Sequence, residues 1–314
     1  MTSAMTNKNR EHKIAVLVPC YNEELTISDV IHDFKSHLPA ADVYVYDNNS
    51  SDDTYNASVR SGAIVRKEKN QGKGNVVRRM FSDIEADIYI LVDGDGTYDA
   101  SVAQRLIDEL CSGPYDMVNV ARVAENSDAY RSGHEWGNKL LTGLVRRIFG
   151  AATTDMLSGY KAFSRRYVKS FPALSTGFEI ETELVVHALD LRLPQSEITA
   201  PYRERPTGSA SKLRTYSDGL RILRLIGFLV KEERPLAFFS IVAGILAMLS
   251  LLIGASVIIE FMETGLVPRL PTAVLATGIM VSALLSLSSG FILDTVTRGR
   301  REAKRLAYLR YPAP

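Results

Sequence analysis

The chain has 314 residues, with 37 lysines and arginines against 36 aspartates and glutamates, and a formal net charge of +1. A nucleic-acid-binding protein normally carries a clear excess of basic residues, so this balance argues against that class. The two cysteines exclude a small scaffold held together by disulfides, and they fit a reducing compartment. The length allows one large domain or two of ordinary size.

Short β-branched runs alternate with segments of helical periodicity through the first part of the chain. Residues 1–12 contain no apolar run, so we expect a disordered leader and no signal peptide. The sequence then predicts strands at 13–19, 42–46, 63–67, 88–92 and 116–121, and helices at 22–37, 54–61 and 76–84. This order predicts an α/β fold, Rossmann-like, with a mostly parallel sheet covered by helices on both faces. Ligands of such sheets bind beyond the carboxyl ends of the strands.

An acidic pentapeptide, DGDGT, follows the fourth predicted strand. Asp93 and Asp95 stand two residues apart with glycines between and after them, which suits a hard divalent cation; a simple polar turn is the alternative. The same letters occur in phosphatases of the haloacid-dehalogenase type, where the first aspartate is the nucleophile. That fold carries the motif on its first strand and needs a later G-D-x-x-x-D, which this chain lacks. A metal that bridges the diphosphate of a nucleotide sugar fits the position better.

Three further motifs stand at predicted strand ends: PCYNEE at 19–24, DNNSSDDT at 47–54 and NQGKGN at 70–75. Together with DGDGT at 93–97, their order and spacing resemble glycosyltransferase family 2, an inverting family with a GT-A fold. The resemblance covers about residues 13–215. The Q-x-x-R-W motif of processive polysaccharide synthases is absent, which argues against a cellulose- or chitin-synthase-like enzyme.

The resemblance implies a role for each matching residue. Asp93 and Asp95 would hold Mg²⁺ or Mn²⁺, with Asp95 the firmer ligand, and Thr97 stands where family members often carry glutamine, so a third protein ligand is left open. The nucleotide would be bound by Pro19, Tyr21, Glu23, Asp47, Lys73 and Asp93. Asp155, in TTDMLSGYKAF, resembles the acidic residue near the acceptor, as a base or an orienting group. The alternatives for that carboxylate are Glu179, Glu181 and Glu183, which could instead be a cluster at a helix N-terminus.

Two uncharged runs, at 235–259 and from 270 to 293, are each longer than the ~20 residues that a transmembrane helix needs. Buried core helices are the alternative. We predict spans at 235–259 and 270–295 and a basic cytosolic tail at 296–314. The connection between the spans is poor in lysine and arginine, whereas the flanks are rich in them, so both termini are expected in the cytosol, at a bacterial inner (plasma) membrane. Association into a homo-oligomer would use the small residues Gly244, Gly254, Gly278 and Gly290.

Two spans after such a domain make the chain resemble polyprenyl-phosphate glycosyltransferases, relatives of dolichol-phosphate mannose synthase. A lipid monophosphate is already anionic at pH 7, so it needs cations to hold it in line more than it needs a strong base. Surface ion pairs are the alternative role for each candidate cation. The candidates for binding the acceptor phosphate are Arg122, Arg131, Arg203, Arg205, Ser209 and Lys212. A basic amphipathic helix at 213–234 would lie on the lipid bilayer.

The expected function is transfer of one sugar from a UDP- or GDP-sugar to polyprenyl phosphate, with inversion, for modification of an envelope glycan or glycolipid. The cytosolic domain at 13–212 would carry the reaction. One alternative keeps the fold but uses another lipid, such as a diacylglycerol. The other is a membrane scaffold that binds a nucleotide without turnover, although a binder has no need for the Asp93 and Asp95 pair. The sugar and the nucleotide are left open.

Overall fold

The structure is a computed structural model that describes residues 12–124, 143, 153–203, 205, 224, 227–228 and 230–313. The predicted leader, apart from residue 12, and most of the predicted amphipathic helix at 213–234 lie outside the described residues. The chain divides into two compact units. The first unit comprises Met1–Leu223 and Lys304–Pro314, and the second comprises Arg224–Ala303.

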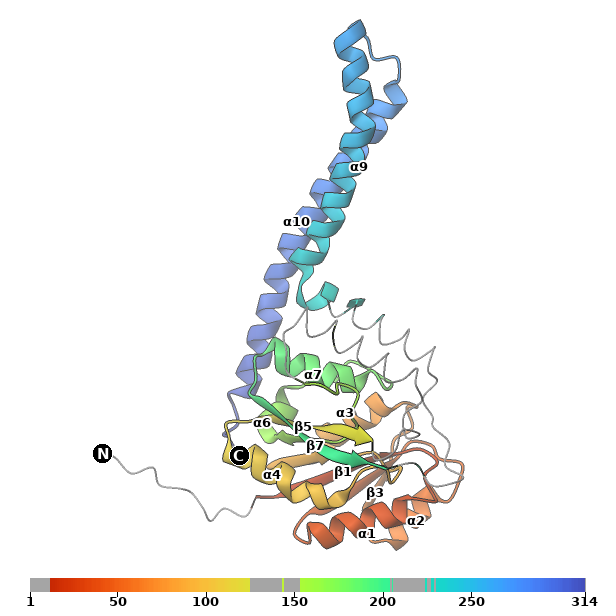
Figure 1. The fold of residues 1–314 in the computed structure, drawn as a ribbon, viewed down its shortest axis with the longest axis vertical. Helices are drawn as coiled ribbons and strands as arrows, with labels where there is room; N and C mark the ends of the chain where they lie inside the picture. The colour runs from red at the N-terminus through yellow and green to blue at the C-terminus, as the bar shows by residue number, and fades with distance from the viewer. Residues whose placement is uncertain are drawn as a thin grey trace, which may run out of the picture. The chain divides into compact units, whose positions relative to one another are not determined.

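The first unit is built on a sheet with helices around it (Figure 1). In the described residues the sheet has seven strands, in the order β3-β2-β1-β4-β6-β5-β7. Its strands are β1 (Ile14–Cys20), β2 (Asp42–Asp47), β3 (Ile64–Lys67), β4 (Ile88–Leu91), β5 (Met117–Ala124), β6 (Lys161–Ser164) and β7 (Gln195–Tyr202). The first four are parallel; β6 is antiparallel to β4 and β5, and β7 is parallel to β5. The predicted α/β class with a mostly parallel sheet is confirmed.

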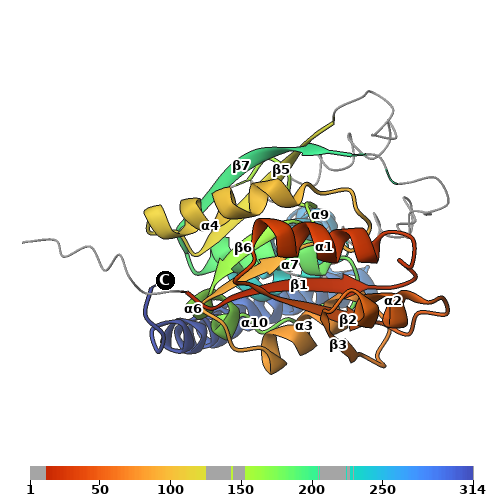
Figure 2. The same cartoon turned by 90° about the horizontal axis from the view of Figure 1, so that it is seen from below.

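Helices pack on both faces of this sheet, because its central strands are apolar on both sides. On one face, Val16 and Val18 of β1 belong to the same core as the buried residues of α1 (Ile27–His37) and α4 (Ala103–Ser112), and Figure 2 shows these two helices side by side over β1. On the other face lies an aromatic cluster around Phe81. The other named helices in the described residues of this unit are α2 (Thr54–Arg60), α3 (Lys73–Asp83), η1 (Ala100–Val102), α6 (Arg165–Ser170) and α7 (Ile180–Asp190).

Two predicted helix starts are wrong, and in both cases the motif residues explain the difference. The first helix begins at Ile27 and not at residue 22, because the PCYNEE segment forms a loop in which Asn22 has φ 53° and the Glu23 N–H donates to Thr54 Oγ1 at 2.8 Å. Helix α3 begins at Lys73 and not at residue 76. Gly72, with φ 126°, ends the preceding loop in a conformation that favours glycine.

The C-terminal residues of the first unit pack against its other residues. Asp116 is fully buried, and its carboxylate accepts hydrogen bonds from Ser164 Oγ at 2.6 Å and Tyr308 Oη at 2.8 Å. The guanidinium of Arg166 binds the same carboxylate at 2.5 and 3.0 Å and lies 4.7 Å from the centre of the Tyr308 ring. The end of α10 is thereby held by a buried charge.

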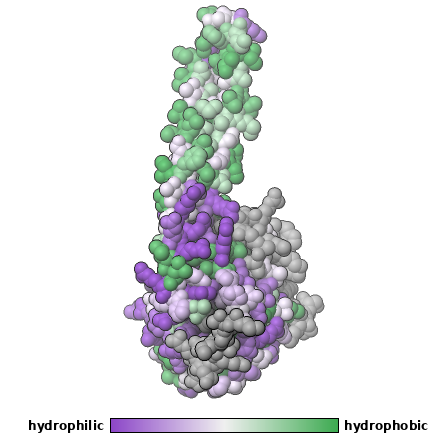
Figure 3. All heavy atoms as spheres, turned by 90° about the vertical axis from the view of Figure 1, so that its left-hand side faces the viewer, coloured by the Kyte–Doolittle hydropathy of each residue, from purple (hydrophilic) through white to green (hydrophobic). Residues whose placement is uncertain are grey.

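The second unit contains α9 (Pro235–Thr264) and most of α10 (Leu270–Tyr308), which extend beyond the predicted spans. Both helices are long and apolar enough to cross a membrane, and on the face that Figure 3 shows, hydrophobic side chains cover most of the upper part of the pair. Their buried positions recur every seven residues: Ala243, Ser250 and Val257 on α9, and Ala276, Ala283, Gly290 and Thr297 on α10. This spacing is typical of paired helices that pack through small residues.

Candidate functional site

The carboxyl ends of β1, β2 and β4 bring the predicted nucleotide-binding residues to one edge of the sheet, as the parallel topology requires. Pro19 lies near the end of β1 and Asp47 ends β2, and Cys20 is the register partner of Asp47. The Thr26 hydroxyl donates to the carbonyl of Gly94 at 2.7 Å, so the first motif contacts the DGDGT segment directly. Tyr21 is 39% exposed at this edge, whereas Glu23 is buried.

Lys73 binds two carboxylates at the same time. Its ammonium lies 2.5 Å from Asp93 Oδ1 and 2.5 Å from Glu181 Oε1. Burial alone would lower the pKa of Lys73, but the two carboxylates outweigh that effect and raise the pKa above its ordinary value. The lysine therefore stays positively charged at neutral pH.

Glu181 is a site residue that the sequence does not single out from its neighbours. It stands in the first turn of α7 and reaches Lys73, which is 108 positions earlier in the chain. Glu183 instead accepts hydrogen bonds from the N–H groups of Leu174 and Ser175, at 2.8 and 2.7 Å. The predicted cluster at a helix N-terminus is thus present, but Glu181 binds a lysine whereas Glu183 binds backbone N–H groups.

Asp95 forms an ion pair with Arg205, which is 110 positions later in the chain. Its Oδ2 lies 2.5 Å from the guanidinium of Arg205, which also lies 4.0 Å from Glu23 Oε1. Its Oδ1 accepts hydrogen bonds from the N–H and the hydroxyl of Thr97, at 3.1 and 2.6 Å. The Asp95 carboxylate is therefore oriented by the backbone of its own motif and buried beneath an arginine.

The charges at Asp93 and Asp95 fit a divalent cation that is only partly held by protein. The described residues contain no group of three or more His, Cys, Asp or Glu side chains that could hold a metal ion. Mg²⁺ and its analogues commonly use one or two carboxylates and complete their coordination with substrate phosphates and water. Each of the two carboxylates already faces a cationic side chain, Lys73 or Arg205, which shows that this edge attracts positive charge.

The segment before β6 closes around Asp93. A Cβ atom at Gly159 would overlap Asp93 Oδ2, so only glycine fits there without a shift of the carboxylate. The N–H of Gly159 donates to the hydroxyl of Tyr98 at 2.7 Å, and the Tyr98 ring lies 5.4 Å from that of Tyr202. These aromatic rings connect the carboxylate edge to the next group of charges.

Asp155 and Arg122 form a bidentate ion pair. Arg122 Nε and Nη2 donate to the two Asp155 oxygens at 2.6 and 2.9 Å, and the Arg122 N–H adds a third bond at 3.2 Å. The guanidinium also lies 5.3 Å from the centre of the Tyr202 ring. Asp155 is buried, and a carboxylate that is bound in this way is oriented firmly. The structure thus brings together two residues that the sequence assigned to the acceptor side.

Two of the other predicted cations, Arg203 and Arg205, lie in the described residues, and their printed ion pairs are with other carboxylates. Arg203 pairs with Asp99 at 3.3 Å and is about half exposed. Arg205 lies at Asp95, on the side predicted for the donor, and not with Arg122. Arg131, Ser209 and Lys212 lie outside the described residues.

Comparisons with known proteins show what this chain is similar to. A family model described as glycosyl transferase family 2 matches residues 15–171. The chain is 32% identical to the glycosyltransferase AglJ of Haloferax volcanii over 291 residues, which are 92% of this chain and 95% of that protein. It is 26% identical to a dolichyl-phosphate hexose transferase of the same organism over 222 residues, 70% of this chain and 95% of that one.

A solved structure of similar fold is glucosyl-3-phosphoglycerate synthase from Mycobacterium tuberculosis, in complex with Mn²⁺, uridine diphosphate and phosphoglyceric acid. The TM-score is 0.58 at 22% identity, and the match covers 70% of this chain and 78% of that chain. At this identity the likeness concerns the fold, and it agrees with a GT-A-like arrangement of the first unit.

Proposed function

The chain belongs to glycosyltransferase family 2, and on that premise we propose that it transfers one sugar from a UDP- or GDP-sugar to polyprenyl phosphate. The observation that carries the proposal is a site with two aspartate carboxylates in one part and an arginine guanidinium in another, in a chain that also has two apolar helices. The carboxylates of Asp93 and Asp95, which pair with Lys73 and Arg205, would face the donor, and the Arg122 guanidinium, which pairs with Asp155, would face the acceptor. A relative named for dolichyl-phosphate hexose transfer supports a lipid phosphate as acceptor.

Asp93 and Asp95 would hold Mg²⁺ or Mn²⁺. When bound, the metal supplies positive charge that stabilises the departing nucleoside diphosphate. The neighbour of similar fold that binds Mn²⁺ and uridine diphosphate supports this assignment. Lys73 keeps its charge because of Asp93 and Glu181, and its ammonium would add positive charge beside the donor phosphates. Pro19, Tyr21, Glu23 and Asp47 would line the nucleotide at the same edge.

The acceptor phosphate needs little activation, because its oxygen is already anionic at pH 7. One phosphate oxygen attacks the anomeric carbon while the bond from that carbon to the diphosphate oxygen breaks and its electrons leave with the nucleoside diphosphate. A single in-line displacement of this kind inverts the anomeric centre, so an α-linked donor gives a β-linked product. Arg122 would hold the acceptor in line and reduce its repulsion from the donor.

Asp155 acts in this mechanism by orienting Arg122. Both Asp155 oxygens accept bonds from Arg122, so the carboxylate fixes the direction of the guanidinium. Orientation is the assignment that suits an acceptor with no proton to lose.

The two apolar helices would cross the membrane with both termini in the cytosol, which puts the site at the cytosolic face. The glycines predicted to support association of copies differ in their surroundings. A Cβ at Gly254 would lie 3.6 Å from that of Ala276, and one at Gly290 would lie 2.9 Å from that of Phe239. These two glycines serve packing between α9 and α10, so Gly244 and Gly278 are the better candidates for contacts between copies.

The test uses purified full-length protein in lipid vesicles with Mn²⁺, polyprenyl phosphate and a panel of radiolabelled UDP- and GDP-sugars. We expect label from one donor to enter the organic phase, and Asp95→Asn to abolish that transfer. Asp108→Asn, a surface change on α4, is the matched control and should leave transfer unchanged. Label that moves to diacylglycerol but not to polyprenyl phosphate would replace the proposed acceptor. Nucleotide binding without transfer to any lipid would favour the scaffold.

A further inference from the structure

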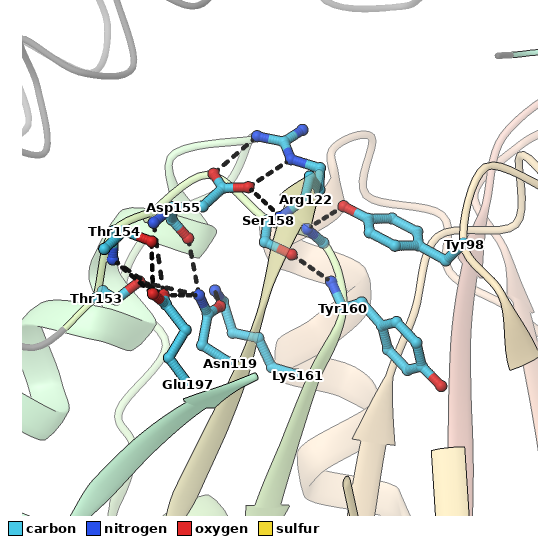
Figure 4. A network of polar contacts seen from close by, with 11 residues as sticks. Tyr98, Asn119, Arg122, Thr153, Thr154, Asp155, Ser158, Tyr160, Lys161 and Glu197 are labelled. Atoms are coloured by element: carbon cyan, nitrogen blue, oxygen red, sulfur yellow. Dashed lines mark hydrogen bonds and ion pairs between the residues drawn. The ribbon is translucent and has the colours of Figure 1, made fainter. Parts of the chain in front are cut away.

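A row of polar side chains crosses three strands beneath the predicted acceptor side. Lys161 of β6, Asn119 of β5 and Glu197 of β7 are register partners, so they project from the same face of the sheet. Lys161 and Asn119 are fully buried. Figure 4 shows the three side chains side by side under the segment that carries Asp155.

The hydrogen bonds along this row all run in one direction, from Lys161 through Asn119 to Glu197. Lys161 has only donors, so its ammonium must face the Asn119 carbonyl oxygen, to which it donates. The Asn119 amide nitrogen then points the other way and donates to Glu197 Oε2 at 2.8 Å. A buried cation thus orients an amide, and the amide helps to hold a carboxylate.

The Glu197 carboxylate accepts hydrogen bonds from the polar groups of residues 153–155. Its oxygens accept hydrogen bonds from the hydroxyls of Thr153 and Thr154, both at 2.5 Å, and from the N–H of Thr154 at 3.0 Å. Asn119 adds bonds to the Thr153 hydroxyl and to the Asp155 carbonyl, both at 2.9 Å. This segment has no regular secondary structure, so its position depends on these side-chain bonds.

Stability alone does not explain such a row. A buried charge pair usually contributes no more to stability than well-packed apolar residues of similar volume would. Burial would raise the pKa of Glu197, but the bonds from Thr153, Thr154 and Asn119 outweigh it and hold the pKa below its usual range. The carboxylate is therefore kept ionised as a fixed acceptor.

We propose that Glu197 is a positioning residue for the acceptor phosphate: by holding residues 153–155 on the sheet, it sets Asp155 and, through Asp155, the guanidinium of Arg122. This inference rests on the proposed function for the identity of the acceptor. Glu197 itself touches neither substrate. Asn119, which is oriented by Lys161, helps to fix the rotamer of the Glu197 side chain.

The main variant is Glu197→Gln, which keeps the shape of the side chain but replaces one acceptor oxygen by an NH₂ donor. We expect the KM for polyprenyl phosphate to rise about 10- to 100-fold, the size of effect that a misplaced substrate-binding group produces. The Kd for the donor nucleotide with Mn²⁺, measured by calorimetry, should stay within about 2-fold of the parent value. Glu109→Gln is the matched control, because Glu109 accepts a bond from the hydroxyl of Ser196, the neighbour of Glu197.

A double substitution separates positioning from general destabilisation. If Glu197 acts through Asp155, then Glu197→Gln combined with Asp155→Asn should be no worse than Asp155→Asn alone. Full additivity of the two losses, or an unchanged KM in Glu197→Gln, would overturn the proposal. An equal loss of nucleotide affinity would do so as well, since the effect would then not be confined to the acceptor side.

Hydrogen exchange provides a readout that needs no turnover. The Arg122 N–H donates to Asp155, so its exchange reports whether the ion pair is in place. Glu197→Gln should speed exchange in peptides covering 121–123 and 153–156, whereas Glu109→Gln should not. If the parent protein transfers no sugar to polyprenyl phosphate, the proposed function fails, and unchanged exchange in Glu197→Gln would separately refute the positioning role.

Discussion

The guanidinium of Arg205 lies 2.5 Å from the Asp95 oxygen Oδ2, on a carboxylate that is almost fully buried. Asp95 is also the residue expected to bind a divalent metal most firmly. The arginine therefore occupies one of the positions that a metal ion would need. Metal binding must displace it, and a displaced guanidinium beside a diphosphate or an acceptor phosphate has a new anionic partner close by.

Arg205→Gln is expected to tighten the binding of Mn²⁺ in the absence of substrates. An ion pair of about 1 kcal/mol that must open first weakens apparent affinity about 5-fold, and the variant removes that cost. Calorimetric titration with Mn²⁺ measures the effect. Arg60→Gln, which removes an exposed ion pair with Asp53, serves as the control. Weaker Mn²⁺ binding in Arg205→Gln would mean that the arginine supports the metal site.

Replacing Asp95 and replacing Asp155 should have different effects on turnover. Asp95→Asn removes a metal ligand, and we expect the transfer rate to fall about 100- to 1,000-fold, as for loss of a group that stabilises charge in the transition state. Asp155→Asn should cost less, because the acceptor phosphate needs orientation more than deprotonation. Initial rates at saturating donor and acceptor decide the order. Comparable losses would return Asp155 to the role of a base.

Gly159→Ala tests the contact between the segment before β6 and Asp93. The added methyl group would overlap Asp93 Oδ2, so the carboxylate has to move away from Lys73. We expect nucleotide affinity in the presence of Mn²⁺ to fall about 10-fold or more, with a smaller change in the unfolding temperature. Gly299→Ala on α10, where no described atom lies within 4 Å of the new methyl group, should leave nucleotide binding unchanged.

The buried Lys161 predicts a definite dependence of stability on pH. Burial lowers its pKa to about 8, although Glu181, Asp155 and Glu197 oppose this effect and Arg122 adds to it. The unfolded chain has a lysine pKa of about 10.4, so between these two values the unfolded state binds more protons than the folded state. The free energy of unfolding contributed by Lys161 should thus rise from about pH 8 to about pH 10.4, and the gain is lost as the pH falls through 8.

The measurement compares the parent protein with Lys161→Met by chemical unfolding at pH 7.5 and at roughly pH 10. Other groups titrate equally in both proteins, so the difference between them isolates the lysine. The parent should gain stability relative to Lys161→Met as the pH increases. A difference that is independent of pH would show that the lysine titrates alike in the folded and unfolded states.

The parallel half of the fold was predictable, because its information is local. Strands β1, β2 and β4 contain short apolar runs, and the motifs at 19–24, 47–54 and 93–97 stand at their carboxyl ends, so the edge that holds Asp47, Asp93 and Asp95 could be inferred. The ends of elements were less predictable. Helix α1 starts late because Thr54, 31 positions away, holds the backbone of Glu23 in a loop.

In the antiparallel half, the patterns predicted β5, as a strand at 116–121, but neither β6 nor β7. Strand β6 is only four residues long, and Lys161 in a sequence of that length reads as a solvated lysine. Its role depends on registers with β4 and β5, which join residues more than 40 positions apart. The pairing of Glu181 with Lys73 could not be predicted for the same reason, since the two residues are 108 positions apart. The sequence proposed Arg122 and Asp155 as candidates for the acceptor side, but it did not predict that they pair with each other.

Asp116 has a consequence for the timing of synthesis. Its hydroxyl donor Tyr308 is 192 positions later in the chain, beyond both apolar helices. At about 5–20 residues per second, a ribosome needs roughly 10–40 s to cover that interval. The hydrogen bond from Tyr308 therefore reaches Asp116 only after both apolar helices have been made. A fragment cut after residue 234 would never receive that contact.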